Sequence, residues 1–203
     1  MAEGSLTVAS LERFLSDYLE EAGAQEGAFC RAAHRLAAHR PLQESEWLTL
    51  NRCSAARRPA RESRAASATL GRRLLQLAGE IGELPLIVAA LHAARDASVD
   101  VHHCAAFGLV GGALELAEEW TVLAYLQQSL TGLVSACQRL MPLGQTRAQR
   151  VLWALKPTLV HAAHVSRTSR LDDMSYADAN SFTPLLDLSA MRHPMLDTRL
   201  FIS

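Results

Sequence analysis

The sequence predicts an all-α protein with a single helical, bundle-like domain of about seven or eight helices and an irregular C-terminal tail. Ala and Leu supply 67 of the 203 residues, whereas Val and Ile supply only 13. Alanine and unbranched side chains favour helix, and β-branched side chains favour strand. Apolar residues also recur at helical spacing between Pro and Gly stops. This period is lost after Ser166, so we divide the chain into a helical domain (1–166) and a tail (167–203).

Four helices are expected in the N-terminal half, each ended by a glycine or a proline. The first carries apolar residues at i, i+3, i+4, i+7 and i+8 from Leu11 and is expected to stop at Gly23. The second closes at Pro41, because proline disfavours helix in the residue before it. The expected ranges are about 11–23, 25–40, 47 to the break at Pro59, and 61–77.

The C-terminal half of the domain predicts four more helices. Pro85 lies where a first-turn proline belongs and opens the first of them. The next, about 101–116, contains Gly108, Gly111 and Gly112, and such small residues would let another helix approach closely. The last two cover about 120–140 and 145–165, separated by a Met-Pro-Leu-Gly turn.

Composition excludes several classes of protein. Twenty basic residues oppose twenty-one acidic ones, giving a formal net charge of −1. A chain so balanced is not expected to bind nucleic acid or a membrane surface in general. No apolar run reaches the 18 residues of a membrane span, and no signal-peptide pattern opens the chain. The four widely spaced cysteines fit neither a zinc site nor a disulfide framework, so a reduced, cytoplasmic setting is expected.

The sequence does not assemble a Ser-His-Asp or Cys-His catalytic site, because it does not show which of these groups meet in space. The Gly108–Gly112 segment lacks the Lys-Ser/Thr of a phosphate-binding loop, so nucleotide hydrolysis by this chain is not expected. His161 and His164 lie three apart on one expected helix and are weak candidates for a metal site. His102-His103-Cys104 is another possible donor cluster, although adjacent helical residues point about 100° apart. The carboxylate pairs Glu118-Glu119 and Asp172-Asp173 are expected on a solvated face and in the tail.

Seven arginines form a local basic run that only Glu62 opposes. We expect an exposed helix face, or half of a charge-matched protein interface, for which arginine suits better than lysine. A nucleic-acid site is the weaker interpretation, because no aromatic residue interleaves with the run. The run consists of Arg52, Arg57, Arg58, Arg61, Arg64, Arg72 and Arg73.

The tail is polar and contains Pro184 and Pro194, yet it keeps apolar clusters. Two interpretations stay open on these grounds: the tail packs on its own domain, or it becomes ordered on a partner. The clusters are Leu185, Leu186 and Leu188, and then Leu200, Phe201 and Ile202.

Three stretches, in this order along the chain, resemble the UreF-type urease accessory proteins. Arg61-Glu62-Ser63-Arg64 through Leu77 is similar to the family's Arg-Glu-rich helix with its Gly-x-x-Leu-Leu pattern. Residues 133–150, with Met141-Pro142-Leu143-Gly144-Gln145 at their centre, look like its long helix, turn and last helix. The terminus, Met191-Arg192-His193 and then Arg199 to Ser203, resembles the family tail.

The resemblance implies a non-enzymatic maturation factor, or chaperone, that is all-α and forms a homodimer. Such a protein binds no cofactor itself and bridges two partners, the scaffold protein UreD (also called UreH) and the GTPase UreG. Through this complex, nickel reaches apo-urease while the GTPase hydrolyses GTP. The family usually opens with a Pro-Val/Ile-Gly segment, so the resemblance implies that this chain begins after it.

The resemblance also assigns roles to tail residues. It implies that the tail docks on the scaffold protein through Met191, Arg192, His193, Arg199, Leu200 and Phe201. Gln145 and Arg150 match the junction of the turn and the last helix, with a structural role or a role at the dimer or GTPase surface. We expect the tail to gain order on binding. The alternatives are a helical metal-binding protein or enzyme using His161 and His164, and a nucleic-acid-binding regulator using the arginine run.

Overall fold

A computed structural model describes residues 7–168, except for the side chain of Leu140. Within this range every secondary-structure element is a helix and there is no strand, which confirms the predicted all-α fold class. The first helical run is continuous, so the described chain has eight separate helical segments. The elements are α1 (Val8–Tyr18), η1 (Leu19–Gly23), α2 (Ala24–Leu36), α3 (Glu44–Ala56), α4 (Arg61–Gly82), α5 (Pro85–Asp96), α6 (His103–Ala113), α7 (Glu118–Leu140), α8 (Gln145–Ala154) and α9 (Lys156–Val165).

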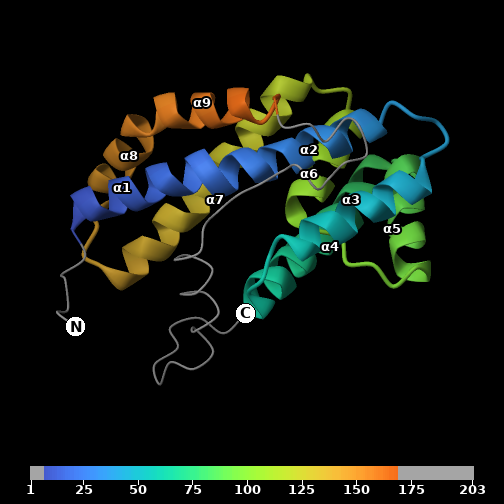
Figure 1. Cartoon of the computed structure of the whole chain (residues 1–203), viewed down its shortest axis with the longest axis horizontal. Helices are drawn as coiled ribbons and strands as arrows, with labels where there is room; N and C mark the ends of the chain where they lie inside the picture. Colours follow the sequence, from blue (N-terminus) through green and yellow to red (C-terminus); the bar gives the residue numbers. More distant parts are fainter. Residues whose placement is uncertain (1–6, 169–203) are drawn as a thin grey trace.

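Helix α2 crosses the middle of the molecule and packs along α6 (Figure 1). Helices α3, α4 and α5 gather at one end, where α4 contacts both α5 and α6. The other end holds α1, η1, α8, α9 and part of α7, and α9 lies against η1. One continuous core cluster joins the two ends, and Trp47 and Phe29 are among its largest buried side chains.

Several stops lie where the sequence predicts them. Pro85 is at the first helical position of α5, where its missing N–H costs nothing. Helix α7 ends at Leu140, and the turn that follows leads into α8 at Gln145. Thr7 begins α1, since its hydroxyl oxygen accepts a hydrogen bond from the backbone N–H of Ser10.

Several predicted boundaries are wrong. Helix α2 ends at Leu36, before the predicted close at Pro41, and α4 continues past Leu77 to Gly82. Gly23 does not stop the first helix, because its φ of −61° is helical and the chain continues through a π turn into α2. The predicted last helix is divided at Leu155 into α8 and α9. Pro157 explains the division, since it has no N–H for the carbonyl of Trp153.

The glycines of α6 allow the close packing that the sequence predicts. A Cβ on Gly108 would overlap the backbone carbonyl of Cys30 on α2. A Cβ on Gly112 would meet the carbonyl of His34, one helical turn further along α2. The close contact of α2 and α6 therefore depends on the absence of these side chains. No helix of the described residues is long and apolar enough to cross a membrane.

Candidate partner-binding surface

The basic run does not form one exposed face, and this corrects the sequence prediction. Arg58 points inward, where its Nη2 donates to Glu26 Oε1 at 2.6 Å and its Nη1 donates to Ser54 Oγ at 2.6 Å. Arg64 donates to the backbone carbonyl of Arg58 at 2.8 Å. These two arginines hold the loop between α3 and α4 in place, so their role is structural.

Arg58 belongs to a polar centre built around the Glu26 carboxylate. The hydroxyl of Tyr125 donates to Glu26 Oε2 at 2.8 Å, and that of Tyr18 donates to the same oxygen at 3.1 Å. Burial raises the pKa of both tyrosines, and the neighbouring Glu26 charge raises it further. They therefore stay protonated and act as donors. This centre ties α1, α2, α7 and the loop after α3 together.

The His102-His103-Cys104 cluster is also part of the interior. His102 is fully buried, and burial lowers its pKa to about 4, with the positive charge of Arg58 contributing. Its backbone N–H donates to Asn51 Oδ1 at 2.9 Å, and its Nδ1 lies 3.2 Å from Ser67 Oγ. The neutral imidazole fills space next to α4 and α3.

The other candidate metal ligands do not converge either. His161 and His164 are exposed on α9. Within residues 7–168, no group of three or more His, Cys, Asp or Glu side chains could hold a metal ion. The His pair therefore has no third protein ligand in this part of the chain.

Four arginines of the run are exposed: Arg61, Arg72 and Arg73 on α4, and Arg52 on α3. Helix α4 also carries an apolar stripe that no other residue of 7–168 covers. Leu70, Leu77 and Ile81 are 53%, 54% and 75% exposed. They follow one another at helical spacing, on a different side from Gly71 and Leu75, which pack into the core. Arg73 lies between them in sequence and is exposed as well. Exposed apolar residues flanked by arginine are typical of a protein interface.

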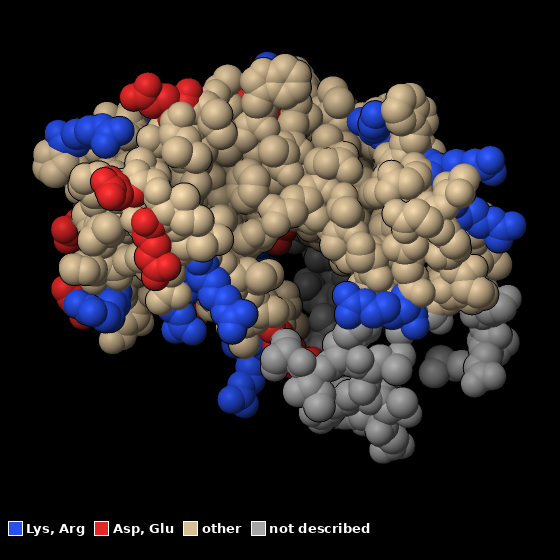
Figure 2. Space-filling view, turned by 180° about the vertical axis from the view of Figure 1, so that it is seen from behind, with Lys and Arg blue, Asp and Glu red and all other residues tan. Residues whose placement is uncertain are grey.

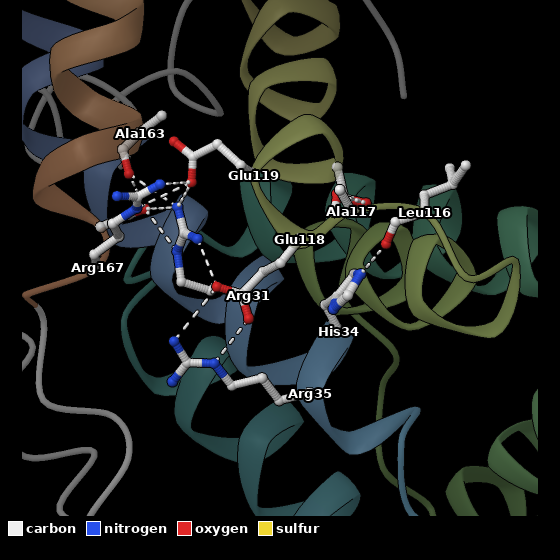
Figure 3. A network of polar contacts seen from close by, with 11 residues as sticks. Arg31, His34, Arg35, Leu116, Ala117, Glu118, Glu119, Ala163 and Arg167 are labelled. Atoms are coloured by element: carbon white, nitrogen blue, oxygen red, sulfur yellow. Dashed lines mark hydrogen bonds and ion pairs between the residues drawn. The ribbon is translucent and has the colours of Figure 1, made fainter.

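A buried ion-pair network, which we call the Arg31 clasp, holds the C-terminal end of α9 (Figure 3). Arg31 on α2 is 3% exposed; its Nη1 donates to Glu118 Oε1 at 2.6 Å and its Nη2 to Glu119 Oε2 at 3.0 Å. Nη2 also donates to the carbonyl of Ala163 at 3.0 Å, and Nε donates to Ser166 Oγ at 3.3 Å. One guanidinium thus joins α2, the start of α7 and the end of α9.

Two exposed arginines complete the Arg31 clasp. Arg35 donates to Glu118 at 2.8 Å, and Arg167 pairs with Glu119 at 2.8 Å. Burial alone would raise the pKa of both carboxyls, but the hydrogen bonds from these arginines and from Arg31 outweigh it and lower the pKa. The prediction that Glu118-Glu119 is a solvated face is therefore wrong. Sequence offered no signal for the pairing, because Arg31 and Glu118 are 87 residues apart.

The structure places one of the two junction residues in a structural contact. Gln145 Oε1 accepts a hydrogen bond from Gln138 Nε2 at 3.2 Å, and the same nitrogen donates to the carbonyl of Leu143 at 3.2 Å. Arg150 is exposed on α8. Asp172-Asp173 and the six predicted tail residues, Met191, Arg192, His193, Arg199, Leu200 and Phe201, lie outside the described residues, so their roles stay predictions.

A protein-family model for UreF matches residues 6–156, three quarters of the chain. The chain belongs to the UreF family. This confirms the family resemblance; the matched range contains the stretches at 61–77 and 133–150 and most of the described helical domain, whereas the stretch at 191–203 lies beyond it.

Individual relatives agree with the family match. The urease accessory protein UreF of Paenarthrobacter aurescens is 33% identical over 144 residues, which are 71% of this chain and 62% of the relative. That of a Picosynechococcus strain is 35% identical over 147 residues, 72% of this chain and 62% of the relative. That of Bradyrhizobium strain BTAi1 is 31% identical over 198 residues, 96% of this chain and 77% of the relative. The chain thus spans about 62% of the length of the first two relatives.

Proposed function

We propose that this UreF-family chain is a non-catalytic urease accessory protein, a chaperone that bridges UreD/UreH and UreG during nickel insertion into apo-urease. The match to UreF over residues 6–156 carries the proposal. Nickel and GTP are handled by the partner complex in this proposal, and the chain itself binds neither tightly. It acts in the cytoplasm, where its partners assemble.

The surface of the helical domain supports a function in protein binding. Arg58 and Tyr125 both donate hydrogen bonds to the Glu26 carboxylate and are not available to a partner. The apolar stripe of α4, by contrast, has no partner within the described residues. We assign the stripe of Leu70, Leu77 and Ile81 to the homodimer. Two copies of this stripe can bury their apolar side chains against each other, because a symmetric interface uses the same patch on both subunits.

The tail is proposed to bind the scaffold protein. Ordering a tail costs about 1–2 kcal/mol per residue of backbone. Each large apolar side chain that is buried returns roughly 1.5–3 kcal/mol, and charge-assisted hydrogen bonds to an arginine return roughly as much. Leu200, Phe201, Arg192 and Arg199 alone cannot offset the cost, so the cluster at Leu185–Leu188 must contribute too.

Co-purification tests the proposal directly. Tagged full-length protein should retain both UreD/UreH and UreG from a co-expressing host, and should restore urease activity to a host that lacks its own UreF. A chain ending at Ser189 should lose the scaffold protein and keep the same melting temperature. If the shortened chain retains the scaffold protein as well as the full chain does, the terminal residues are not the interface.

A further inference from the structure

The last two described helices carry a charge of one sign only. Between Trp120 and Thr168 the chain has five basic residues and no Asp or Glu. Of the five, Arg167 is engaged in the Arg31 clasp. Arg147, Arg150 and Lys156 are exposed on α8 and α9 and pair with no acidic side chain of the described residues. In Figure 2, the side of the molecule where α8 lies shows Lys and Arg side chains and almost no acidic ones.

Apolar side chains are exposed in the middle of this basic surface. Trp153 is 70% exposed and Val160 is 57% exposed. The Lys156 ammonium lies 3.6 Å from the centroid of the Trp153 ring, a cation–π contact that holds the indole in place. Arg150 and Trp153 lie about one turn apart on α8, and Lys156 and Val160 lie about one turn apart on α9. An exposed tryptophan held by a cation, with Arg150 one helical turn away, is the composition of an interface hot spot.

We propose that this α8–α9 surface docks an acidic protein partner, one that presents carboxylates around an apolar pocket for Trp153. The proposal rests on the proposed function, because it supplies the second partner-binding surface that a bridging protein needs besides its tail. Cations that have no acidic partner favour a negatively charged protein, and the exposed Trp153 ring needs an apolar pocket to bury it.

The neighbouring helices favour an acidic protein over a nucleic acid. Asp17, Glu20 and Glu21 are exposed on α1 and η1, and η1 packs directly against α9. Their charges would repel a phosphate backbone that crosses the surface, whereas a protein presents carboxylates locally. Trp153 is also the only aromatic residue of α8 and α9, and single-stranded nucleic acid uses several aromatic platforms in succession.

A second copy of the chain is also a poor occupant. A two-fold dimer would bring the basic surface against itself, because a symmetric interface uses the same patch on both subunits. Arg147, Arg150 and Lys156 would then face their own copies without a carboxylate between them. The occupant that matches the charge is a different protein.

The test measures binding of the full chain to purified UreD/UreH, UreG and apo-urease, each immobilised in turn. Two variants remove the surface: Trp153→Ala, and Arg147→Glu combined with Arg150→Glu. The control combines Arg40→Glu with Arg95→Glu, which reverses two exposed charges elsewhere. We expect both surface variants to weaken binding to the same partner roughly tenfold or more, while the control binds as the wild type does. Wild-type affinity should fall with salt, and less steeply for the double variant.

Other outcomes overturn the proposal. If both variants bind all three partners with wild-type affinity, the surface is not an interface, although the proposed function stands. If the wild type binds a 20-nucleotide poly-U and the double variant does not, the occupant is a nucleic acid. If Trp153→Ala turns a dimer into a monomer, measured by light scattering, the occupant is a second copy. If the wild type binds none of the three proteins, the proposed function fails together with this inference.

Discussion

At the scale of single residues, Arg31 is the side chain on which the junction of α2, α7 and α9 depends. We expect Arg31→Met to lower the free energy of unfolding by about 1–3 kcal/mol, because Glu118, Glu119 and the Ala163 carbonyl each lose one donor and keep another. Urea denaturation measures the change. Arg72→Met, an exposed residue on α4, is the matched control and should stay within about 0.5 kcal/mol of the wild type. Equal losses in both variants would contradict the structural role of Arg31.

Glycine offers a second comparison between single residues. Gly108→Ala should strongly destabilise the protein, since a Cβ there overlaps the backbone of Cys30 and α2 and α6 would have to separate. Gly132→Ala on α7 has open space around it and should stabilise the protein by roughly 0.5–1 kcal/mol. Thermal unfolding of the two variants gives the sign of each change. A neutral Gly108→Ala would show that the close approach is not required.

His102 makes stability depend on pH. Its pKa is lowered to about 4 in the folded protein, whereas an unfolded histidine titrates near 6.5. The unfolded state therefore binds more protons below pH 6.5, and stability falls as the pH falls. Between pH 6.5 and 5 we expect a loss of roughly 1.5–2 kcal/mol.

The variant His102→Leu should flatten that pH dependence, even though it changes the absolute stability. Denaturant titrations at several pH values measure the slope. The clasp carboxylates act in a lower window: their pKa values are below the usual 4.5, so their contribution is present above that value and is lost only as the pH falls further. An unchanged slope for His102→Leu between pH 6.5 and 5 would contradict the assignment.

At the scale of elements, α4 has an apolar side that the fold does not use. Replacing Leu70 and Leu77 together by Ser should change the free energy of unfolding of the monomer little, because both side chains are about half exposed. The same change should shift a homodimer toward monomer, because each buried leucine contributes roughly 1.5–3 kcal/mol to an interface. Light scattering measures the mass, and Leu75→Ser, which is buried, is the comparison that should unfold the protein instead. A dimer that survives the double change would exclude the stripe as its interface.

At the scale of the whole molecule, one core cluster runs through the described helices, and we expect residues 7–168 to unfold as one cooperative unit. Far-UV circular dichroism follows all the helices, whereas the fluorescence of Trp47, read in a variant with Trp120→Phe and Trp153→Phe, reports on the core between α3 and α5. Trp47 is fully buried and its Nε1 donates to the Ala90 carbonyl at 3.0 Å. The two signals should share one midpoint in urea. Separate midpoints would divide the domain into independent halves.

The sequence by itself determined the helices, their order and most of their ends. Apolar periodicity and helix-limiting residues such as Pro85 and Gly144 act on the backbone within a few residues of the chain, so the sequence is enough to read them. The family was also readable, since short ordered stretches carried the resemblance. The close approach of α6 to another helix could be predicted because small residues are visible in sequence, but its partner, α2, could not.

The tertiary structure decided which polar residues face inward. Arg58 and Arg64 looked like part of an exposed run, and Glu118-Glu119 looked solvated. Arg58 and Glu118-Glu119 are paired with side chains of other elements, because a buried charge needs a partner. Arg64 donates to a carbonyl of the loop before α4. Arg31 and Glu118 are brought together over 87 residues of chain, a distance at which no periodic pattern operates. The exposure of the α4 stripe and of Trp153 could not be predicted from the sequence either. Apolar spacing predicts a helix face, but only the packing shows whether another element covers that face.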